Sequence, residues 1–271
     1  MIADFHNDYL TDKKYKTIIE KYKDGDNKIV GAIFKNSADY VYAKSILNYF
    51  LTNRSKNLYF AFEDFSYDED IHNLIYGLLR FKPAYVGLTW NYENNLAYGS
   101  FADGKIKKRG VEVIKALNIN EVFLDVAHLC EKSFYDALNY TDSILCSHAC
   151  FYDVLNHPRN LKKKQLKKII ELGGLVGLTL YRPFLTHNKT CTVGDVYRHV
   201  DYFAQNFGTD NLSLGTDFYG CNDFPEGFSD YDFESEFREF LLKKGYSEKS
   251  VNAVFYDNIS NFLERACPYF G

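Results

Sequence analysis

Three of the seven histidines in this 271-residue chain lie at or near the ends of apolar runs of the kind that form buried strands. His6 and Asp8 follow the first run, and residues two positions apart on a strand point to the same side. Glu63, His128 and His148 lie at the ends of later runs. Imidazole and carboxylate groups are ligands that zinc and similar divalent cations prefer. If the strands are parallel, these side chains meet at one edge of a sheet, in a set large enough for two metal ions.

Other polar side chains end neighbouring apolar runs. Trp90 and Asn91 follow the fourth run, Tyr181 the seventh and Asp217 the eighth. A single histidine in such a place is more often a hydrogen-bonded structural residue than a ligand. Three of them together with carboxylates favour a metal site. A carboxylate such as Glu63 can bridge two cations roughly 3.5–4 Å apart, which lower the pKa of a shared water.

Eight short β-type runs alternate with amphipathic segments of helical length along the chain. The predicted strands are Ile2–Phe5, Ile29–Phe34, Leu58–Phe62, Tyr85–Thr89, Val122–Val126, Ile144–Ser147, Leu175–Leu180 and Leu212–Gly215. The predicted helices are Lys14–Tyr22, Ala38–Leu51, Asp70–Phe81, Gly110–Leu117, Lys132–Asn139, Lys162–Leu172, Val193–Phe207, Phe233–Lys244 and Glu248–Arg265. Several strands are nearly continuous apolar runs, which is typical of parallel strands covered on both faces.

This alternation predicts an α/β fold, a single (β/α)8 barrel of the TIM type in one domain over residues 1–271. The alternative is a doubly wound open sheet, but no Gly-x-Gly-x-x-Gly follows the first strand. Barrel enzymes keep their chemistry at the C-terminal ends of the strands, which is where the polar residues above are predicted to lie.

Composition excludes several partners. A net charge of -4 offers no basic face for nucleic acid. Asp4 and Asp8 interrupt the apolar N-terminus, which argues against a signal peptide, and no apolar run approaches the roughly 20 residues of a membrane span. The six cysteines form no Cys-x-x-Cys pair, so we expect reduced thiols. We therefore expect a cytoplasmic protein with a small-molecule substrate and no nucleic-acid or membrane partner.

In chain order, the strand-end segments resemble those of the membrane (renal) dipeptidase family, peptidase family M19. The similar segments are Asp4–Asp8, Phe62–Glu63, Leu88–Asn91, Leu124–His128, Cys146–His148, His157–Asn160, Gly173–Gly174 and Gly215–Phe218. Each segment is short, but eight in the same order over nearly the whole chain are specific. The resemblance implies a metallopeptidase on a TIM-type barrel that hydrolyses dipeptides.

The resemblance also implies two zinc ions per chain. His6 and Asp8 would bind one ion, His128 and His148 would bind the other, and Glu63 would bridge the two. A hydroxide that bridges the ions would attack the peptide carbonyl, and the products would be two amino acids. These ligand types do not separate zinc from manganese or cobalt.

Substrate contacts follow from the same resemblance. Arg159 and Tyr181 would grip the C-terminal carboxylate of the dipeptide, which the planar fork of arginine suits. Asp217 would contact the free amino end or handle the proton passed to the leaving amine. Trp90 and Asn91 would line the substrate site. Family likeness is compatible with a homodimer, although no stripe in the sequence indicates one.

Three features depart from the family pattern. Trp90 stands where the animal enzymes have a histidine thought to steady the tetrahedral intermediate, and an indole offers one neutral N–H donor and no titratable group. Asp217-Phe218-Tyr219-Gly220 stands where the family commonly reads Asp-Phe-Asp-Gly. The chain is short for the family and shows neither the secretory signal nor the lipid-anchor tail of the animal enzymes, which favours an intracellular protein.

Two alternative functions stay open. The first is another metal-barrel hydrolase that acts on a different amide, a lactone or a phosphoester. Amidohydrolases usually open with His-x-His, and this chain opens with His6-Asn7-Asp8, which argues against that relative. The second is a barrel that binds a metal or a small ligand and has lost activity, with Trp90 as the lesion.

Overall fold

Eight parallel strands close into a barrel in the computed structural model, which describes residues 1–34 and 40–267. Each strand pairs with the next one along the chain, and the last pairs with the first. The strands are β1 (Ala3–Asn7), β2 (Lys28–Phe34), β3 (Leu58–Glu63), β4 (Tyr85–Gly87), β5 (Phe123–Asp125), β6 (Ile144–Ala149), β7 (Val176–Leu178) and β8 (Leu212–Leu214). The predicted (β/α)8 barrel is confirmed.

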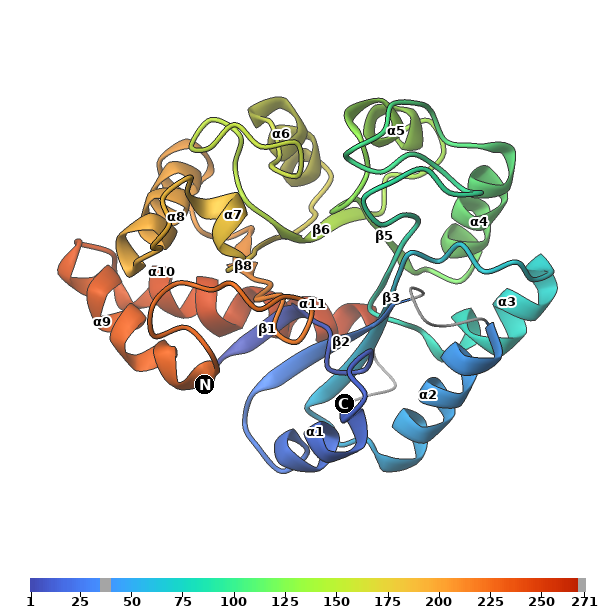
Figure 1. Ribbon diagram of the computed structural model, residues 1–271, viewed down its shortest axis with the longest axis horizontal. Coiled ribbons are helices and arrows are strands. Elements are labelled where there is room, and N and C mark those ends of the chain that lie inside the picture. Colours follow the sequence, from blue (N-terminus) through green and yellow to red (C-terminus); the bar gives the residue numbers. More distant parts are fainter. Residues whose placement is uncertain (35–39, 268–271) are drawn as a thin grey trace.

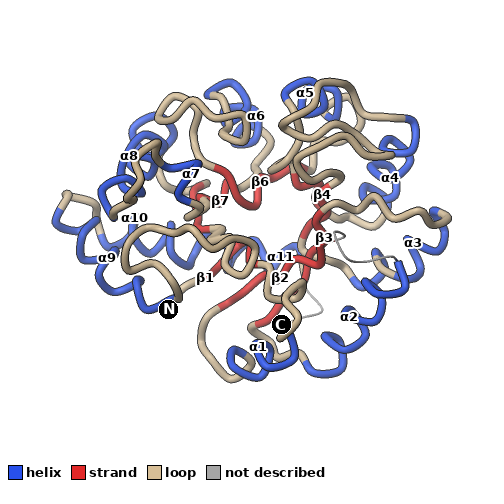
Figure 2. The backbone as a smooth tube through the Cα atoms, viewed as in Figure 1, coloured by secondary structure: helices blue, strands red, loops and turns tan. Residues whose placement is uncertain are grey.

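Helices form an outer layer around the strands (Figure 1), and Figure 2 shows the strands as the inner ring. The helices are α1 (Tyr15–Tyr22), α2 (Tyr40–Asn53), α3 (Ile71–Gly77), α4 (Lys108–Ile119), α5 (Glu131–Ala137), α6 (Lys163–Glu171), α7 (Arg182–Leu185), α8 (Val193–Phe207), α9 (Glu234–Lys243), α10 (Glu248–Asn252) and α11 (Asn258–Ala266). Among the described residues, no helix has both the length and the apolar character needed to cross a bilayer. All six cysteines are free thiols, as predicted.

Several helices differ from their predicted bounds. The helix predicted over Asp70–Phe81 ends at Gly77, because Leu78 leaves helical geometry and a 3₁₀ turn, Leu79–Phe81, follows. The helix predicted over Glu248–Arg265 contains a π-helical segment, Ala253–Asp257, between α10 and α11. The helix α7 was not predicted, since four residues are too few to show a helical period. The first two residues of the predicted helix Ala38–Leu51 lie outside the described residues.

The N-terminal end of the barrel is filled by an aromatic side chain from α11. The ring of Phe262 packs edge-on against Phe5 of β1, with centroids 5.2 Å apart, and against Phe123 of β5, with centroids 5.0 Å apart. In Figure 1, α11 accordingly passes behind the strands. Because this end is packed with apolar rings, polar chemistry is left to the opposite end, where the strands terminate.

Two strands carry irregular register close to their C-terminal ends. Pairing of β1 with β2 shifts between Asp4 and Asn7, and pairing of β6 with β7 shifts between Cys146 and Ala149. Both strands extend beyond their predicted bounds, so His6 and His148 lie within them. Bulges at barrel rims re-aim side chains, and here each shift coincides with a histidine of the predicted site.

Candidate metal centre and substrate cavity

Three imidazole rings meet at the C-terminal end of the barrel. His6 lies in β1, His148 in β6, and His128 three residues beyond the end of β5. The Nε2 atoms of His128 and His148 are 2.8 Å apart, and the ring of His6 stacks on that of His148 with centroids 3.7 Å apart. Residues that are 142 positions apart in the chain are therefore in contact, as the parallel strands predict.

Three carboxylates complete this cluster. Asp8 Oδ2 lies 3.5 Å from His6 Nε2, and Asp217 Oδ1 lies 3.9 Å from the same nitrogen. Glu63 divides its oxygens between two imidazoles: Oε2 lies 3.5 Å from His6 Nε2, and Oε1 lies 2.7 Å from His128 Nε2. Because its two oxygens face different rings, Glu63 is placed to contact two cations at once.

Hydrogen bonds hold the Nδ1 atoms of the first two imidazoles. His6 Nδ1 donates to the hydroxyl of Tyr85 at 2.9 Å, and that hydroxyl donates to the carbonyl of Phe5. His128 Nδ1 donates to Asn91 Oδ1 at 3.1 Å. An N–H at Nδ1 leaves the Nε2 lone pair free, which is how outer partners set the tautomer of a metal-binding histidine.

The third imidazole is held by a serine and a buried acid. His148 Nδ1 donates to Ser147 Oγ at 2.8 Å, and Ser147 Oγ donates to Asp125 Oδ2 at 2.5 Å. Asp125 Oδ1 also accepts the backbone N–H groups of Ser147 and Ala127. All three imidazoles thus direct Nε2 into the cluster.

The electrostatics of the cluster favour a cation. Burial, together with Arg159 and the neighbouring imidazoles, lowers the pKa of His128 and His148 well below its usual value, so both are neutral. Burial would also lower the pKa of His6, but Asp8, Glu63 and Asp217 outweigh it and raise that pKa to about 10. The negative field at His6 Nε2 therefore attracts positive charge.

The residues fit a divalent metal. Buried atoms His6 Nε2 and Asp8 Oδ1 lack a hydrogen-bond partner among the described residues. Leaving a buried polar atom unpaired costs about 1–3 kcal/mol, which a bound cation would offset. Donor atoms of His6, Glu63 and His148 lie within 4.8 Å of one another, as do those of His6, Asp8 and Asp217. Nitrogen and carboxylate donors in these numbers suit zinc, manganese or cobalt.

A cavity of about 460 Å³ adjoins the cluster, within the range of small-molecule sites. Every predicted site residue lines it except His6, which lies fully buried beneath. Its other walls include Phe34, Phe184 and Tyr219. A larger cavity of about 1030 Å³ lies at the opposite end of the barrel, but its walls contain no histidine and only exposed acids. The chemistry therefore belongs to the smaller cavity.

Arg159 forms a buried wall of this cavity. Its Nη1 donates to the carbonyl of Ala127, and its Nη2 donates to the carbonyl of His148 at 3.3 Å and to His128 Nε2 at 3.2 Å. Its Nε–H has no hydrogen-bond partner among the described residues. A guanidinium has five N–H donors, so Arg159 keeps capacity for an anionic ligand.

The other predicted substrate residues occupy different kinds of position. Tyr181 precedes α7 and packs edge-on against Phe184, with ring centroids 4.8 Å apart. Trp90 is 37% exposed at the cavity wall, and its ring lies 6.5 Å from that of His128. Asn91 lines the cavity too, but its Oδ1 orients His128, a positioning contact that the sequence does not reveal.

A tight approach shapes the loop after β8. Asp217 and Tyr219 both have left-handed backbones, with φ of +65° and +67°. Gly220 passes so close to the carboxylates of Asp8 and Asp217 that a Cβ there would collide with both. A larger residue at this position would push these two carboxylates aside.

Sequence reasoning misses the residues that support the site. Tyr85, Ser147 and Asp125 orient imidazoles, yet Tyr85 and Ser147 appear in the sequence as ordinary strand residues. His199 is a further residue whose partners the sequence does not show. It is fully buried on α8, where Nδ1 accepts the N–H of Phe151 and Nε2 donates to the carbonyl of Leu185, each at 3.2 Å. The partners are distant in the chain, so spacing carries no signal for them.

The fold and the cluster together define a metal-binding (β/α)8 barrel whose donors lie at the C-terminal strand ends. The profile of the membrane dipeptidase family, peptidase family M19, matches residues 73–267. The chain therefore belongs to this family of metallo-dipeptidases. The matched part contains His128, His148, Arg159 and Asp217, whereas His6 and Glu63 precede it.

Individual relatives agree with this assignment. The chain is 27% identical over 155 residues to an uncharacterized dipeptidase of Schizosaccharomyces pombe, an alignment that covers 54% of this chain and only 37% of that protein. A solved M19 metallopeptidase, dipeptidase AC, has the same fold, with a TM-score of 0.82, 20% identity and 98% of both chains covered. A metallopeptidase from Rhodobacter sphaeroides, solved with a phosphinate mimic of L-Ala-D-Ala, superposes with a TM-score of 0.81 and 19% identity, covering 98% of this chain and 99% of that one.

Proposed function

We propose that this protein hydrolyses dipeptides with two zinc ions bound at the strand-end cluster. The observation that carries the proposal is the convergence of three Nε2 atoms with three carboxylates beside a cavity of dipeptide size. The proposed ligands are His6 and Asp8 for one ion, His128 and His148 for the other, and Glu63 for both. When bound, such a pair would polarise the peptide carbonyl and lower the pKa of a shared water towards neutrality.

Arg159 and Tyr181 would recognise the C-terminal carboxylate of the substrate. Arg159 is buried and borders the cavity, so it supplies a fixed positive charge where a carboxylate would lie. A planar guanidinium binds a carboxylate through paired N–H groups, which fixes orientation as well as charge. The solved relative with a phosphinate dipeptide mimic supports a dipeptide as the ligand class.

Asp217 would receive the free amino group or manage the proton that the leaving amine needs. Burial and the neighbouring Asp8 carboxylate raise the pKa of Asp217 to about 7, although His6 and Arg159 oppose the shift. A group with a pKa near the working pH can both hold and release a proton, which is the requirement for general acid–base catalysis. Its position at the cavity wall gives it access to substrate.

Trp90 is expected to affect the catalytic rate. Its indole lines the cavity but adds no titratable group near the reacting bond. Losing a donor that stabilises a transition state costs on the order of 10²–10³ in rate. We therefore expect Trp90 to affect rate and substrate choice more than metal binding, since it is not one of the donors in the cluster.

A panel of dipeptides tests the proposal. Zinc-loaded protein is incubated with L-L, L-D and glycyl dipeptides, amino-acid release is measured by chromatography, and bound metal is counted by elemental analysis. We expect release of both amino acids from at least part of the panel, with loss of activity on chelation and its return with zinc.

The metal count makes a negative result informative. Protein that carries two metal ions and cleaves nothing in the panel would contradict the dipeptidase proposal and favour a barrel that has lost its activity. Cleavage of a lactone or phosphoester instead would assign another hydrolase reaction to the same cluster.

A further inference from the structure

An aromatic crescent borders the substrate cavity on the side of Arg159. Six rings follow one another with centroid distances between 4.7 and 6.1 Å. The members, in spatial order, are Phe34, Trp90, Tyr92, Phe101, His157 and Phe184. They come from the end of β2, from the loops after β4 and β6, and from α7. Loops that are distant in the chain thus form one continuous surface.

The crescent is partly inside the cavity and partly outside it. Phe34, Trp90 and Phe184 line the cavity, whereas Tyr92 and Phe101 continue beyond its walls. Tyr92 is 62% exposed and Phe101 is 48% exposed. Large aromatic side chains are normally buried, and a contiguous exposed group beside a cavity marks a surface that binds a ligand.

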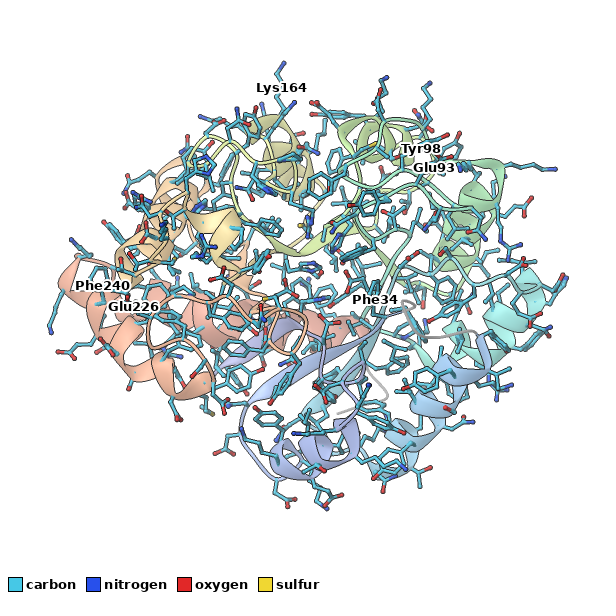
Figure 3. The ribbon with its side chains drawn as sticks, in the orientation of Figure 1. Phe34, Glu93, Tyr98, Lys164, Glu226 and Phe240 are labelled. Atoms are coloured by element: carbon cyan, nitrogen blue, oxygen red, sulfur yellow. The ribbon has the colours of Figure 1, made fainter. Side chains whose placement is uncertain are left out.

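The loop after β4 is folded so that Tyr92 and Phe101 lie side by side. Residues Glu93 and Tyr98, labelled in Figure 3, pair as an antiparallel bridge. The N–H of Gly99 donates to the carbonyl of Tyr92 at 3.0 Å, and a Cβ on Gly99 would collide with the backbone of Trp90 and Asn91. Because the return segment packs this closely, Phe101 is fixed against Tyr92 and does not fold into the core.

We propose that the crescent binds the side chain of the substrate's C-terminal residue and selects for an aromatic ring at that position. This inference rests on the proposed dipeptidase function and specifies its substrate class. The crescent is continuous with the cavity walls through Trp90 and Phe184, so a ring that leaves the cavity would lie on Tyr92 and Phe101.

The position of Arg159 indicates that the C-terminal residue of the dipeptide lies beside the crescent. Its guanidinium carbon lies 5.3 Å from the centre of the Phe184 ring, and its backbone N–H donates to His157 Nδ1 at 3.2 Å. A carboxylate bound by Arg159 therefore places the adjoining Cα, and its side chain, next to the Phe184 end of the crescent. The amino end of the substrate would lie towards Asp8 and Asp217.

The expected gain is in binding more than in chemistry. Each well-placed aromatic pair contributes enough to change affinity roughly threefold to tenfold. The outer rings do not touch the reacting bond, so they stabilise substrate and transition state alike, which lowers KM and leaves kcat nearly constant. The preference for an aromatic C-terminal residue should therefore appear as a difference in KM.

Two isomeric dipeptides test the assignment in the zinc-loaded protein. Glycyl-L-phenylalanine should have a kcat/KM about tenfold above that of L-phenylalanylglycine, with most of the difference in KM. Equal values for the isomers, or a preference for L-phenylalanylglycine, would overturn the proposal. The comparison is internally matched, since both isomers have the same composition and charge.

Substitutions in the crescent test whether its rings cause the preference for an aromatic C-terminal residue. Phe101→Ser and Tyr92→Ser should each lower the ratio of kcat/KM for glycyl-L-phenylalanine over glycylglycine by about fivefold. Tyr76→Ser is the matched control, because Tyr76 is a 66% exposed aromatic residue on α3. A ratio that stays unchanged in both crescent variants, or falls equally in Tyr76→Ser, would contradict the proposal.

Fluorescence separates this inference from the catalytic one. Trp90 is the only tryptophan in the chain, so indole emission reports on the part of the crescent that lines the cavity. Glycyl-L-phenylalanine should shift or quench this emission at concentrations where glycylglycine does not. Hydrolysis without any change in emission would contradict the crescent proposal and leave the dipeptidase proposal standing. A change in emission without hydrolysis of any dipeptide would support binding at the crescent and contradict the catalytic proposal.

Discussion

The metal-binding floor of the cavity lies at the C-terminal ends of the strands, whereas most of the aromatic crescent at its mouth comes from loops. The floor consists of His6, Asp8, Glu63, His128, His148 and Asp217. On the floor, each of the three imidazoles is buried and has its Nδ1 tied to a named partner. In the crescent, Tyr92 and Phe101 are about half exposed and touch each other through their rings. The first region holds individual atoms in place through hydrogen bonds, and the second offers exposed aromatic surface.

This contrast has a physical basis. Donors for a metal must be held in a narrow range of positions, and rigid strands with outer hydrogen bonds supply that precision. Recognition of a flat side chain needs only apolar surface at about the right place, which loops can supply. Substitutions on the floor should therefore act through the metal, and substitutions in the crescent through KM.

The largest effect is expected when a floor ligand is removed. His128→Ala should lose one metal equivalent per chain and lower kcat by more than about 100-fold, because losing even an outer partner of a ligand costs about 10–100-fold. Metal content by elemental analysis and steady-state kinetics check this. His72→Ala, at an exposed position on α3, is the control and should keep both values. Unchanged metal stoichiometry in His128→Ala would show that the ligand assignment is wrong.

The next-largest effect is expected at His199, which holds together two segments that carry crescent residues, the loop after β6 and α7. It bonds Phe151 in the loop after β6 and Leu185 in α7, and both bonds require a neutral ring with its proton on Nε2. Burial lowers the pKa of His199 to about 4. The unfolded chain therefore takes up the proton first as pH falls. The stability from His199 is complete above pH 6.5 and is lost as pH falls towards 4, by about 3 kcal/mol in all.

Urea unfolding at pH 7.0, 5.5 and 4.5 measures this contribution. The free energy of unfolding of His199→Gln should depend less on pH than that of the unmodified protein. His187→Gln, at an exposed position, should follow the unmodified protein. Parallel pH dependence for His199→Gln and the unmodified protein would refute a buried neutral role for this ring.

The smallest effect is expected when a residue that orients a metal ligand is changed. Ser147→Ala removes the link between His148 and Asp125 and should weaken metal affinity about 10–100-fold, as loss of an outer partner does. Competition with a fluorescent chelator measures the affinity. Ser213→Ala is the matched control, since Ser213 is equally buried on β8 but its hydroxyl donates to the carbonyl of Val176, away from the imidazoles. If both variants bind metal alike, the serine link does not position His148.

Much of the floor could be predicted because parallel strands end at one edge. His6, Asp8, Glu63, His128 and His148 each lie at or just beyond a predicted strand, so topology alone brings them together. The confirmed strands differ from prediction by one to a few residues at their ends. The register shifts of β1 and β6 were not predictable, because a bulge depends on the neighbouring strand and not on local propensity.

The sequence by itself determined the barrel and the donors at its rim, since alternating apolar runs and polar strand ends are local features with a fixed geometric consequence. Only the tertiary structure decided which groups orient those donors and which rings border the cavity. Tyr85 holds His6 from 79 positions away, and Phe101 meets His157 across two loops. Such contacts depend on how distant segments pack in three dimensions, which spacing along the chain does not encode.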